Sequence, residues 1–194
     1  DAKYKETTSS FSGSYSSGSH LLKKIKKYNI KGFADAINTA CSSSSNAIML
    51  GSKLLKEGKA KRVIVGGTDA LSKFTVNGFN ALNILSSDAC KPFDKNRKGL
   101  SLGEGSAYLI LEASESVPEK NCYAQITGYG NSSDAYHASS MSDDARGIIL
   151  AITKAIESAK ISPESIDYIN THGTATQNND YLELLGIKKV IGKW

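Results

Sequence analysis

The sequence has few cysteines, and they stand far apart. Only Cys41, Cys90 and Cys122 occur in 194 residues, and no C-x-x-C pair is present. An odd number of cysteines at wide spacing argues against a zinc ribbon and against a disulfide framework. Reduced thiols are typical of the cytosol, so we expect a cytoplasmic protein. Because cysteine is usually buried, Cys90 and Cys122 are predicted to be structural.

Long apolar runs are also absent. No stretch approaches the ~20 apolar residues that a helix needs to span a bilayer. The first five residues, Asp-Ala-Lys-Tyr-Lys, show no apolar signal segment. We therefore expect no membrane partner and no secretory signal. The hydrophobic content of 40% and the charged content of 22% are ordinary for a globular protein, which is long enough here to bury a core.

Positive charge is the main bias in composition. The net charge is +5 and is concentrated in two clusters: Lys23, Lys24, Lys26, Lys27 and Lys31, and then Lys53, Lys56, Lys59, Lys61 and Arg62. Such clusters suit nucleic acid, but no nucleic-acid-binding motif accompanies them, so we expect no nucleic-acid partner. Solvated helix faces are the simplest interpretation, and docking of an acidic protein is the alternative.

Strand-like and helix-like segments alternate along the chain. Amphipathic or strongly helical patterns predict helices at 20–28, 45–57, 75–85, 144–160 and 180–190. Short apolar runs predict strands at 34–39, 62–67, 106–112, 124–129 and 166–171, with 62–67 and 106–112 buried. Alternating elements of this kind predict a layered α/β fold.

Cys41 is the first candidate for a catalytic residue. It lies between a predicted strand and a predicted helix, and four serines follow it directly. The positive end of a helix dipole favours the thiolate, which is the nucleophilic form of the side chain. The alternative is a small apolar residue in the core. Position alone leaves both interpretations open.

His172 is the second candidate. It ends a short apolar segment and opens a loop of small residues, Gly173-Thr174-Ala175-Thr176. A cysteine and a histidine at the ends of separate strands suit a nucleophile and its acid/base or oxyanion partner. We expect Cys41 and His172 to face one pocket.

Four motifs follow one another along the chain: Thr39-Ala40-Cys41-Ser42-Ser43, then Pro92-Phe93-Asp94 with Gly103-Glu104-Gly105, then Asp134-Ala135-Tyr136-His137, and finally His172-Gly173-Thr174-Ala175-Thr176. In this order they closely resemble the β-ketoacyl-acyl carrier protein synthases of the thiolase superfamily. The resemblance implies a thiolase-like, layered α-β-α-β-α fold, of which this chain covers the middle portion. Residues 1–113 would be the latter part of the N-terminal half, with the nucleophile, and 114–194 the beginning of the C-terminal half.

The resemblance implies a decarboxylating Claisen condensation in fatty-acid or polyketide-like biosynthesis. Cys41 matches the nucleophile that receives the acyl group, and its backbone N–H would form part of an oxyanion hole. His172 matches a neutral histidine that donates a hydrogen bond to the malonyl thioester oxygen. No cofactor is implied, because the substrates are carried on the phosphopantetheine of acyl carrier protein. Acyl carrier protein is the expected partner, and the full-length protein is expected to be a homodimer.

Other residues match positions around the family's active site. Thr174 and Thr176 match hydroxyls that line the pantetheine tunnel, and His137 and Ser139 lie in a motif beside the site. Asp180 and Glu183 match acidic positions that contact a lysine absent here, so they are expected to be unpaired charges. Ordinary solvated helix acids are the alternative, and the spacing does not suit a metal site.

The segment between the cysteine and histidine motifs is expected to be structural. Phe93, Asp94, Arg97 and Glu104 are predicted to form a turn and a loop that brace the cysteine region. Gly103-Glu104-Gly105 lacks the third glycine of a dinucleotide-binding fingerprint.

The chain is expected to be a fragment. Compared with the family pattern, roughly the first third is missing, and so is a C-terminal region with a lysine, a second histidine and a gating loop. The fragment alone is therefore predicted to be inactive in condensation. The alternatives are an inert fragment, a non-catalytic partner subunit that binds carrier protein, or an acyltransferase that does not decarboxylate. Cys41 argues against the partner subunit, because such subunits usually lack the cysteine.

Overall fold

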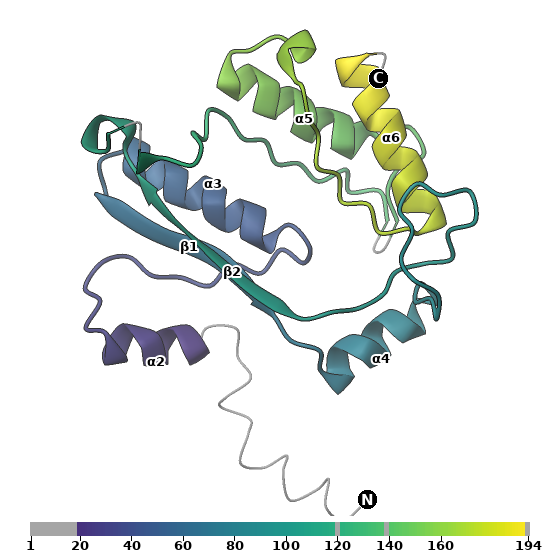
Figure 1. The fold of residues 1–194 in the computed structure, drawn as a ribbon, viewed down its shortest axis with the longest axis horizontal. Coiled ribbons are helices and arrows are strands. Elements are labelled where there is room, and N and C mark those ends of the chain that lie inside the picture. Colours follow the sequence, from purple (N-terminus) through teal and green to yellow (C-terminus); the bar gives the residue numbers. More distant parts are fainter. Residues whose placement is uncertain (1–18, 119–120, 138–139, 193–194) are drawn as a thin grey trace, which may run out of the picture. The chain divides into compact units, whose positions relative to one another are not determined.

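A computed structural model describes residues 19–118, 121–137 and 140–192 of the chain. The elements, labelled in Figure 1, are α2 (Ser19–Lys27), α3 (Ser43–Lys56), β1 (Arg62–Asp69), α4 (Lys73–Ala81), β2 (Gly105–Glu112), the short 3₁₀ helix η1 (Ser114–Ser116), α5 (Arg146–Ala159), the 3₁₀ helix η3 (Pro163–Ser165) and α6 (Gln177–Ile191). The five predicted helices are confirmed, and so are two of the five predicted strands. In the described ranges, no helix is long and apolar enough to cross a membrane.

The chain forms two compact units. Of the described residues, 19–67, 107–118 and 121 belong to the first, and 68–106, 122–137 and 140–192 belong to the second. The predicted division of the family fold between residues 113 and 114 stays a prediction.

The first unit is built on the pairing of β1 with β2. At one end of the pair, Arg62 donates from Nη2 to Glu112 Oε1 at 2.6 Å. At the other end of the pair are Thr68 and Ser106, which are counted in the second unit, and their hydroxyls are 2.8 Å apart. Because residue numbers rise along one strand as they fall along the other, the two strands are antiparallel.

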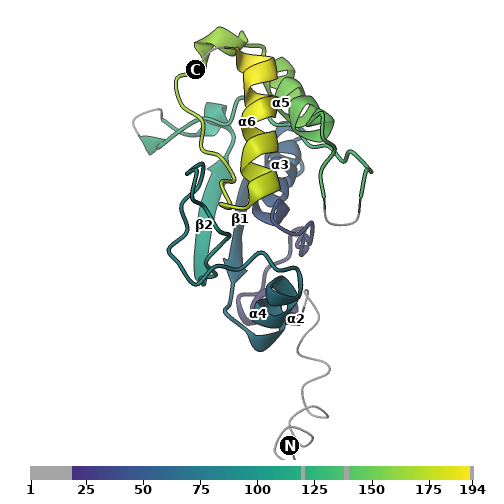
Figure 2. The same cartoon turned by 90° about the vertical axis from the view of Figure 1, so that its right-hand side faces the viewer.

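Helix α3 lies along one face of this sheet (Figures 1 and 2). A Cβ atom at Gly51 would be 2.7 Å from Val65 Cγ1 and 3.4 Å from Val63 Cγ1, so only glycine allows the helix to come this close. The helix ends where Gly58 adopts a positive φ of 65°, and the Gly58 N–H donates to the Leu55 carbonyl.

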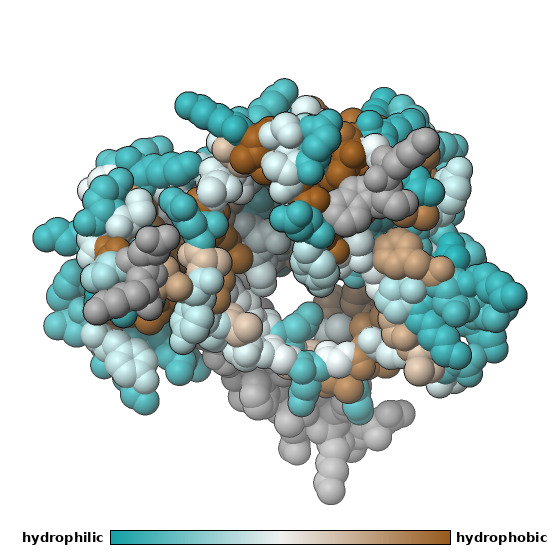
Figure 3. All heavy atoms as spheres, turned by 45° about the horizontal axis from the view of Figure 1, so that its top comes forward, coloured by the Kyte–Doolittle hydropathy of each residue, from teal (hydrophilic) through white to brown (hydrophobic). Residues whose placement is uncertain are grey.

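The other side chains of the sheet reach the surface. Ile64, Tyr108 and Ile110 are 66%, 62% and 64% exposed. Leu109, which points to the opposite face of β2, is 51% exposed as well. The prediction that 106–112 is a buried strand is therefore wrong for this structure. Figure 3 shows hydrophobic side chains, in brown, reaching the surface among hydrophilic ones on the face that it presents.

The second unit has its core between α5 and α6, which lie side by side in Figures 1 and 2. Its buried apolar residues are Ala145, Ile156, Ala175, Leu182 and Ile187. Ala175 comes from the loop before α6, so the core of this unit includes part of the His172 motif.

The predicted strands at 34–39, 124–129 and 166–171 are absent from the structure. A strand needs a neighbouring strand to pair its backbone groups, and the described part of the chain pairs only β1 with β2 in a sheet. Residues 128–130 run along α5 instead: a Cβ at Gly128 would be 2.5 Å from Ala159 N, and one at Gly130 would be 2.8 Å from Ala155 N. Apolar pattern alone did not distinguish this extended packing on a helix from a strand.

Two glycine-to-alanine replacements inside helices should have opposite effects on stability. A Cβ at Gly186 of α6 would lie 2.6 Å from Ile148 Cγ2 and 3.0 Å from Ile148 Cβ, whereas Gly78 of α4 has nothing within 4 Å. We expect Gly186→Ala to lower the free energy of unfolding by about 1–3 kcal/mol through overpacking. Gly78→Ala should raise it by about 0.5–1 kcal/mol through helix propensity. Urea denaturation measures both, and equal effects of the two would contradict the α5–α6 packing.

Candidate active site

Cys41 lies immediately before a helix. Helix α3 begins at Ser43 with Ser42 as its N-cap, so the predicted helix start is confirmed. Cys41 is exposed, which makes its sulfur accessible to a reagent. The nucleophilic role of Cys41 stays a prediction at this point, since exposure and position are both shared by cysteines that do no chemistry.

Polar side chains hold the cysteine turn in shape. The Thr39 N–H donates to Ser43 Oγ at 2.9 Å, and Ser42 Oγ donates to the Thr39 carbonyl at 2.8 Å. Asn46, which is buried, donates from Nδ2 to Thr39 Oγ1 at 2.8 Å. Ala40 has a positive φ of 52°, a conformation that costs a non-glycine residue about 1–2 kcal/mol. These hydrogen bonds therefore hold a strained turn directly before Cys41.

The other two cysteines do not behave as predicted. Cys90 and Cys122 are exposed, so the expectation that they are buried structural residues is wrong for this structure. Cys90 Sγ donates to the carbonyl of Thr174 at 3.7 Å. Exposure therefore does not distinguish Cys41 from the other two thiols. Cys41 differs from them in lying just before the start of a helix, α3.

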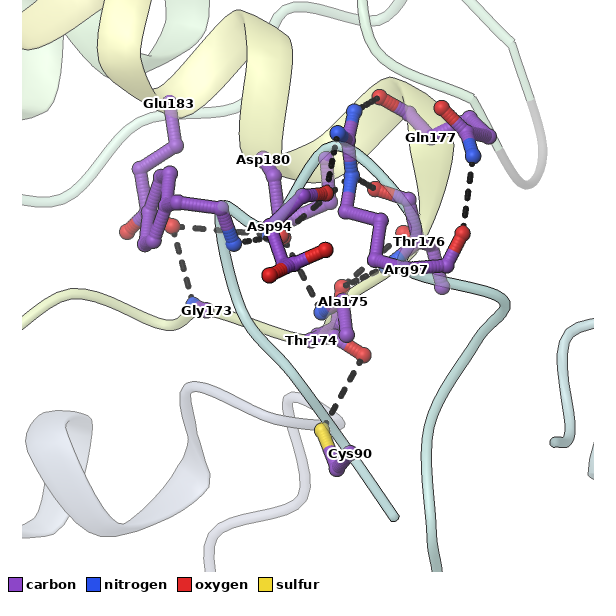
Figure 4. A network of polar contacts seen from close by, with 12 residues as sticks. Cys90, Asp94, Arg97, Gly173, Thr174, Ala175, Thr176, Gln177, Asp180 and Glu183 are labelled. Carbon is purple, nitrogen blue, oxygen red and sulfur yellow. Dashed lines mark hydrogen bonds and ion pairs between the residues drawn. The ribbon is translucent and has the colours of Figure 1, made fainter. Parts of the chain in front are cut away.

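The backbone at His172 is held by a carboxylate from α6. Glu183 accepts the His172 N–H at Oε1 (2.6 Å) and the Gly173 N–H at Oε2 (2.9 Å). Glu183 reaches back to these residues because it lies in the second turn of the helix that the loop leads into (Figure 4). The side chain of His172 is exposed. The loop therefore presents the imidazole at the surface of the second unit from a fixed backbone.

Asp180 holds the other end of the same loop. Its carboxylate is 1% exposed and accepts the Ala175 N–H at Oδ1 (3.0 Å) and the Phe93 N–H at Oδ2 (2.7 Å). Its Oδ2 also lies 3.5 Å from Arg97 Nε. The expectation that Asp180 and Glu183 are unpaired charges is wrong, because backbone N–H groups and an arginine satisfy them. Their predicted place on one face of a helix is confirmed by α6.

Arg97 connects the segment around Phe93 to the loop at residues 172–176, the histidine loop. Its guanidinium donates to the carbonyls of Thr176 (Nε, 3.2 Å) and Gln177 (Nη2, 2.9 Å), and Gln177 Nε2 donates back to the Arg97 carbonyl at 3.0 Å. Figure 4 shows these contacts converging on the N-terminus of α6. Phe93 and Arg97 are predicted to brace the cysteine region, but in the structure Arg97 donates to the carbonyls of Thr176 and Gln177, and Phe93 donates to Asp180.

The remaining predicted site residues are placed as follows. Thr174 and Thr176 share a hydrogen bond between their hydroxyls, at 2.9 Å. His137 is exposed, and Ser139 lies outside the described residues. In the ranges that the structure describes, no three His, Cys, Asp or Glu side chains gather as metal ligands would. Cys41 belongs to the first unit and His172 to the second, and their meeting in one pocket stays a prediction.

Residues that follow the Asp134-Ala135-Tyr136-His137 motif hold Asp134 in place. The Ser142 N–H donates to Asp134 Oδ2 at 2.9 Å, and Arg146 Nη2 donates to the Asp134 carbonyl at 2.8 Å. The bond from the Ser142 backbone holds the pKa of the Asp134 carboxyl below its ordinary value, and the Tyr136 N–H and the charge of Arg146 add to this.

The lowered pKa of Asp134 predicts a pH dependence. A carboxyl group with a depressed folded-state pKa stabilises the fold at pH values above its ordinary pKa, and this contribution is lost as pH falls through the folded pKa. We expect an NMR titration of the Asp134 carboxyl carbon to give a lower midpoint in the folded chain than in the chain unfolded by urea. A midpoint equal to or above that of the unfolded chain would contradict the hydrogen bonding described here.

Comparisons with known proteins show that the four motifs lie in segments that match one protein family. The family model "Beta-ketoacyl synthase, N-terminal domain" matches residues 25–116, and "Beta-ketoacyl synthase, C-terminal domain" matches residues 123–194. The chain belongs to the β-ketoacyl synthase family. The N-terminal match contains Cys41 and the C-terminal match contains His172, so both candidate residues lie in family sequence.

Curated relatives carry a more specific name. The 3-oxoacyl-[acyl-carrier-protein] synthase 2 of Staphylococcus aureus is 36% identical over 171 residues, covering 84% of this chain and 42% of that protein. The protein of the same name from Synechocystis is 40% identical over 171 residues, covering 84% of this chain and 41% of that protein. The chain thus spans about two fifths of the length of these relatives.

Solved β-ketoacyl synthases have the same fold. A ketosynthase of Xenorhabdus doucetiae, in complex with its chain length factor, matches with a TM-score of 0.83 and 39% identity over 91% of this chain and 43% of that one. A type II PKS ketosynthase in complex with its acyl-carrier protein matches with a TM-score of 0.84 and 31% identity over 91% of this chain and 46% of that one. The predicted thiolase-like α/β fold class is confirmed.

Proposed function

We propose that the protein containing this chain is a β-ketoacyl-acyl carrier protein synthase. It joins an acyl group, bound to Cys41, to the two-carbon unit left when malonyl-acyl carrier protein loses CO₂. The observation that carries this proposal is the pair of motifs at Cys41 and His172 within matches to the two domains of one family of condensing enzymes.

Cys41 is proposed as the nucleophile. A thiolate attacks a thioester well and also leaves well, so the acyl group can be taken from one thioester and given up to a carbanion. The position before α3 supports this role, because the N-terminal end of a helix favours negative charge. The backbone N–H of Cys41 is proposed as one donor of the oxyanion hole.

His172 is proposed to act on the malonyl group. A neutral imidazole N–H that donates to the malonyl thioester oxygen stabilises the enolate charge that develops as CO₂ leaves. The hold of Glu183 on the backbone of His172 and Gly173 supports this role, because an oxyanion donor must be fixed before the reaction. Thr174, Thr176, His137 and Ser139 are proposed to contact the pantetheine arm.

The proposed partner is acyl carrier protein. The resemblance to a ketosynthase solved with its acyl-carrier protein supports this assignment, and the lysine clusters of the first unit suit an acidic partner. We further propose that the full-length protein is a cytoplasmic homodimer that needs no cofactor, since its substrates arrive on phosphopantetheine.

The 194 residues by themselves are proposed not to condense substrates. Condensation in the family uses a second histidine and a second oxyanion donor, and this chain has His172 but no Gly-His-x-x-Gly element. Loss of one oxyanion donor costs about 10²–10³ in rate, and loss of an acid/base partner costs about 10²–10⁴. Slow acylation of Cys41 is expected to survive.

A condensation assay tests the proposed function. The protein is incubated with acyl-carrier thioester and then with malonyl-acyl carrier protein, and CO₂ release and β-ketoacyl product are measured together. Both should appear in the full-length protein. Acyl transfer without CO₂ would identify a non-decarboxylating acyltransferase, and neither acyl transfer nor CO₂ would identify a carrier-binding partner subunit. Either result overturns the proposal.

A further inference from the structure

Arg97 donates hydrogen bonds to the end of the loop that begins at His172. Three of its nitrogens donate to three different backbone carbonyls: Nη1 to Asp94 (3.1 Å), Nε to Thr176 (3.2 Å) and Nη2 to Gln177 (2.9 Å). The planar guanidinium has donors in a fixed fork, so these bonds fix direction as well as distance. They join the segment around residue 94 to the end of the loop that begins at His172.

The same guanidinium neutralises the carboxylate that holds the loop. Asp180 is buried, and its oxygens accept the N–H groups of Ala175 and Phe93. A buried carboxylate is retained in ionised form only when a cation or hydrogen-bond donors compensate it. Arg97 is 15% exposed and lies 3.5 Å from this carboxylate, so it supplies the positive charge that the arrangement needs.

The backbone that Asp180 holds is strained at two places, one in the loop after His172 and one in the segment around residue 94. Ala175 and Phe93 have positive φ values of 61° and 63°, which are rare for residues other than glycine. Each of these two residues donates its N–H to Asp180. A backbone held in such a conformation relaxes when its anchoring contacts are removed. Only Gly173 and Thr174 lie between His172 and Ala175, so a change in the backbone at Ala175 changes the direction of the imidazole.

Glu183 and Arg97 hold different parts of the loop. Glu183 anchors the amides of His172 and Gly173, whereas Arg97, directly and through Asp180, anchors residues 175–177. With one anchor at each end, the loop has a single orientation. With the Arg97 anchor weakened, only the two hydrogen bonds to Glu183 hold the loop, and the backbone from His172 to Ala175 can turn about them.

We propose that Arg97 is a positioning residue for His172, acting through Asp180 and the carbonyls of Thr176 and Gln177. The inference rests on the role proposed for His172 in malonyl decarboxylation. Arg97 touches neither substrate nor reacting atoms in this account. Its effect is to keep the imidazole N–H aimed at one point, which an oxyanion donor requires.

Arg97→Lys tests the proposal, because it keeps the positive charge but loses the fork of donors. Without the fork, residues 176 and 177 and the Asp180 carboxylate are no longer held in one arrangement, so the hydrogen bond from the Ala175 N–H to Asp180 should weaken. Hydrogen exchange of the Ala175 amide should rise about 10-fold to 100-fold, the size expected when a hydrogen bond to a charged group is lost. Exchange in α5 should not change. The ¹⁵N signals of the His172 imidazole should shift or broaden, and malonyl decarboxylation by the full-length protein should fall while acylation of Cys41 stays normal.

Two further variants keep the test decisive. Lys98→Ala is the matched control, because Lys98 is the next residue and pairs with Asp88 at the surface, and it should change none of these readouts. Arg97→Ala removes the side chain altogether, and guanidinium ion added below denaturing concentrations should restore the His172 signals and the decarboxylation rate in this variant.

Unchanged Ala175 exchange and unchanged His172 signals in Arg97→Lys would overturn the inference. Exchange that rises equally across α5 and α6 would also overturn it, since that result belongs to a residue that only stabilises the fold. Failure of the proposed function has a different signature: wild-type protein that takes no acyl group onto Cys41. The exchange and imidazole measurements do not depend on that result.

Discussion

Replacing Asp180 with alanine should lower the free energy of unfolding by about 3–5 kcal/mol, the cost of breaking a buried ion pair from one side. The variant leaves the partly buried Arg97 guanidinium without its carboxylate and the amides of Phe93 and Ala175 without their acceptor. Asp180 accepts one of these N–H groups at each of its two oxygens, and alanine has no acceptor in its side chain. Urea denaturation followed by circular dichroism measures the change.

Asp88 offers a matched control for this prediction. It also forms an ion pair with a neighbouring cation, Lys98, but both side chains are more than half exposed. Surface pairs of this kind contribute little to stability, so Asp88→Ala should leave the denaturation midpoint nearly unchanged. Similar losses of unfolding free energy in the two variants would contradict the larger contribution predicted for the buried Asp180.

Replacing His172 with alanine should slow malonyl decarboxylation by the full-length protein about 10²-fold to 10³-fold, the usual effect of removing one oxyanion donor. The loss should fall on the decarboxylation step, because the proposed role concerns the malonyl oxygen and not the acyl transfer. Acylation of Cys41 should therefore proceed at the wild-type rate. Release of CO₂ from malonyl-carrier protein measures the first step, and intact mass measures the second.

His20→Ala provides a control of the same residue type. His20 lies in α2 and matches none of the four motifs, so its replacement should leave both steps unchanged. Decarboxylation at the wild-type rate in His172→Ala would remove His172 from the proposed mechanism. Equal losses of acylation and decarboxylation would indicate damage to the fold in place of a lost donor.

The helices could be predicted because each has a local signal. The apolar spacing at 45–57 and 144–160 predicted α3 and α5. The strands were harder, because a strand depends on a partner that the sequence does not reveal. The pattern at 124–129 predicted a strand, yet in the structure Gly128 and Gly130 pack against the backbone of α5.

The residues of the candidate site could be predicted from the sequence, but the hydrogen bonds and the ion pair between them could not. The motifs located Cys41 at a helix start and Asp180 with Glu183 on one helix. They did not reveal that Arg97 reaches a carboxylate 83 residues further on (180 − 97). Only the fold brings these residues together.

The measurement that tests the central claim most directly is the location of the acyl group after the protein is incubated with an acyl-carrier thioester. The protein is digested, and each cysteine-containing peptide is examined by mass spectrometry. All three thiols are exposed, so exposure alone predicts a mixture of adducts. We expect the acyl mass on the peptide that contains Cys41. An adduct on Cys90 or Cys122 in preference to Cys41, or no adduct at all, would contradict this expectation.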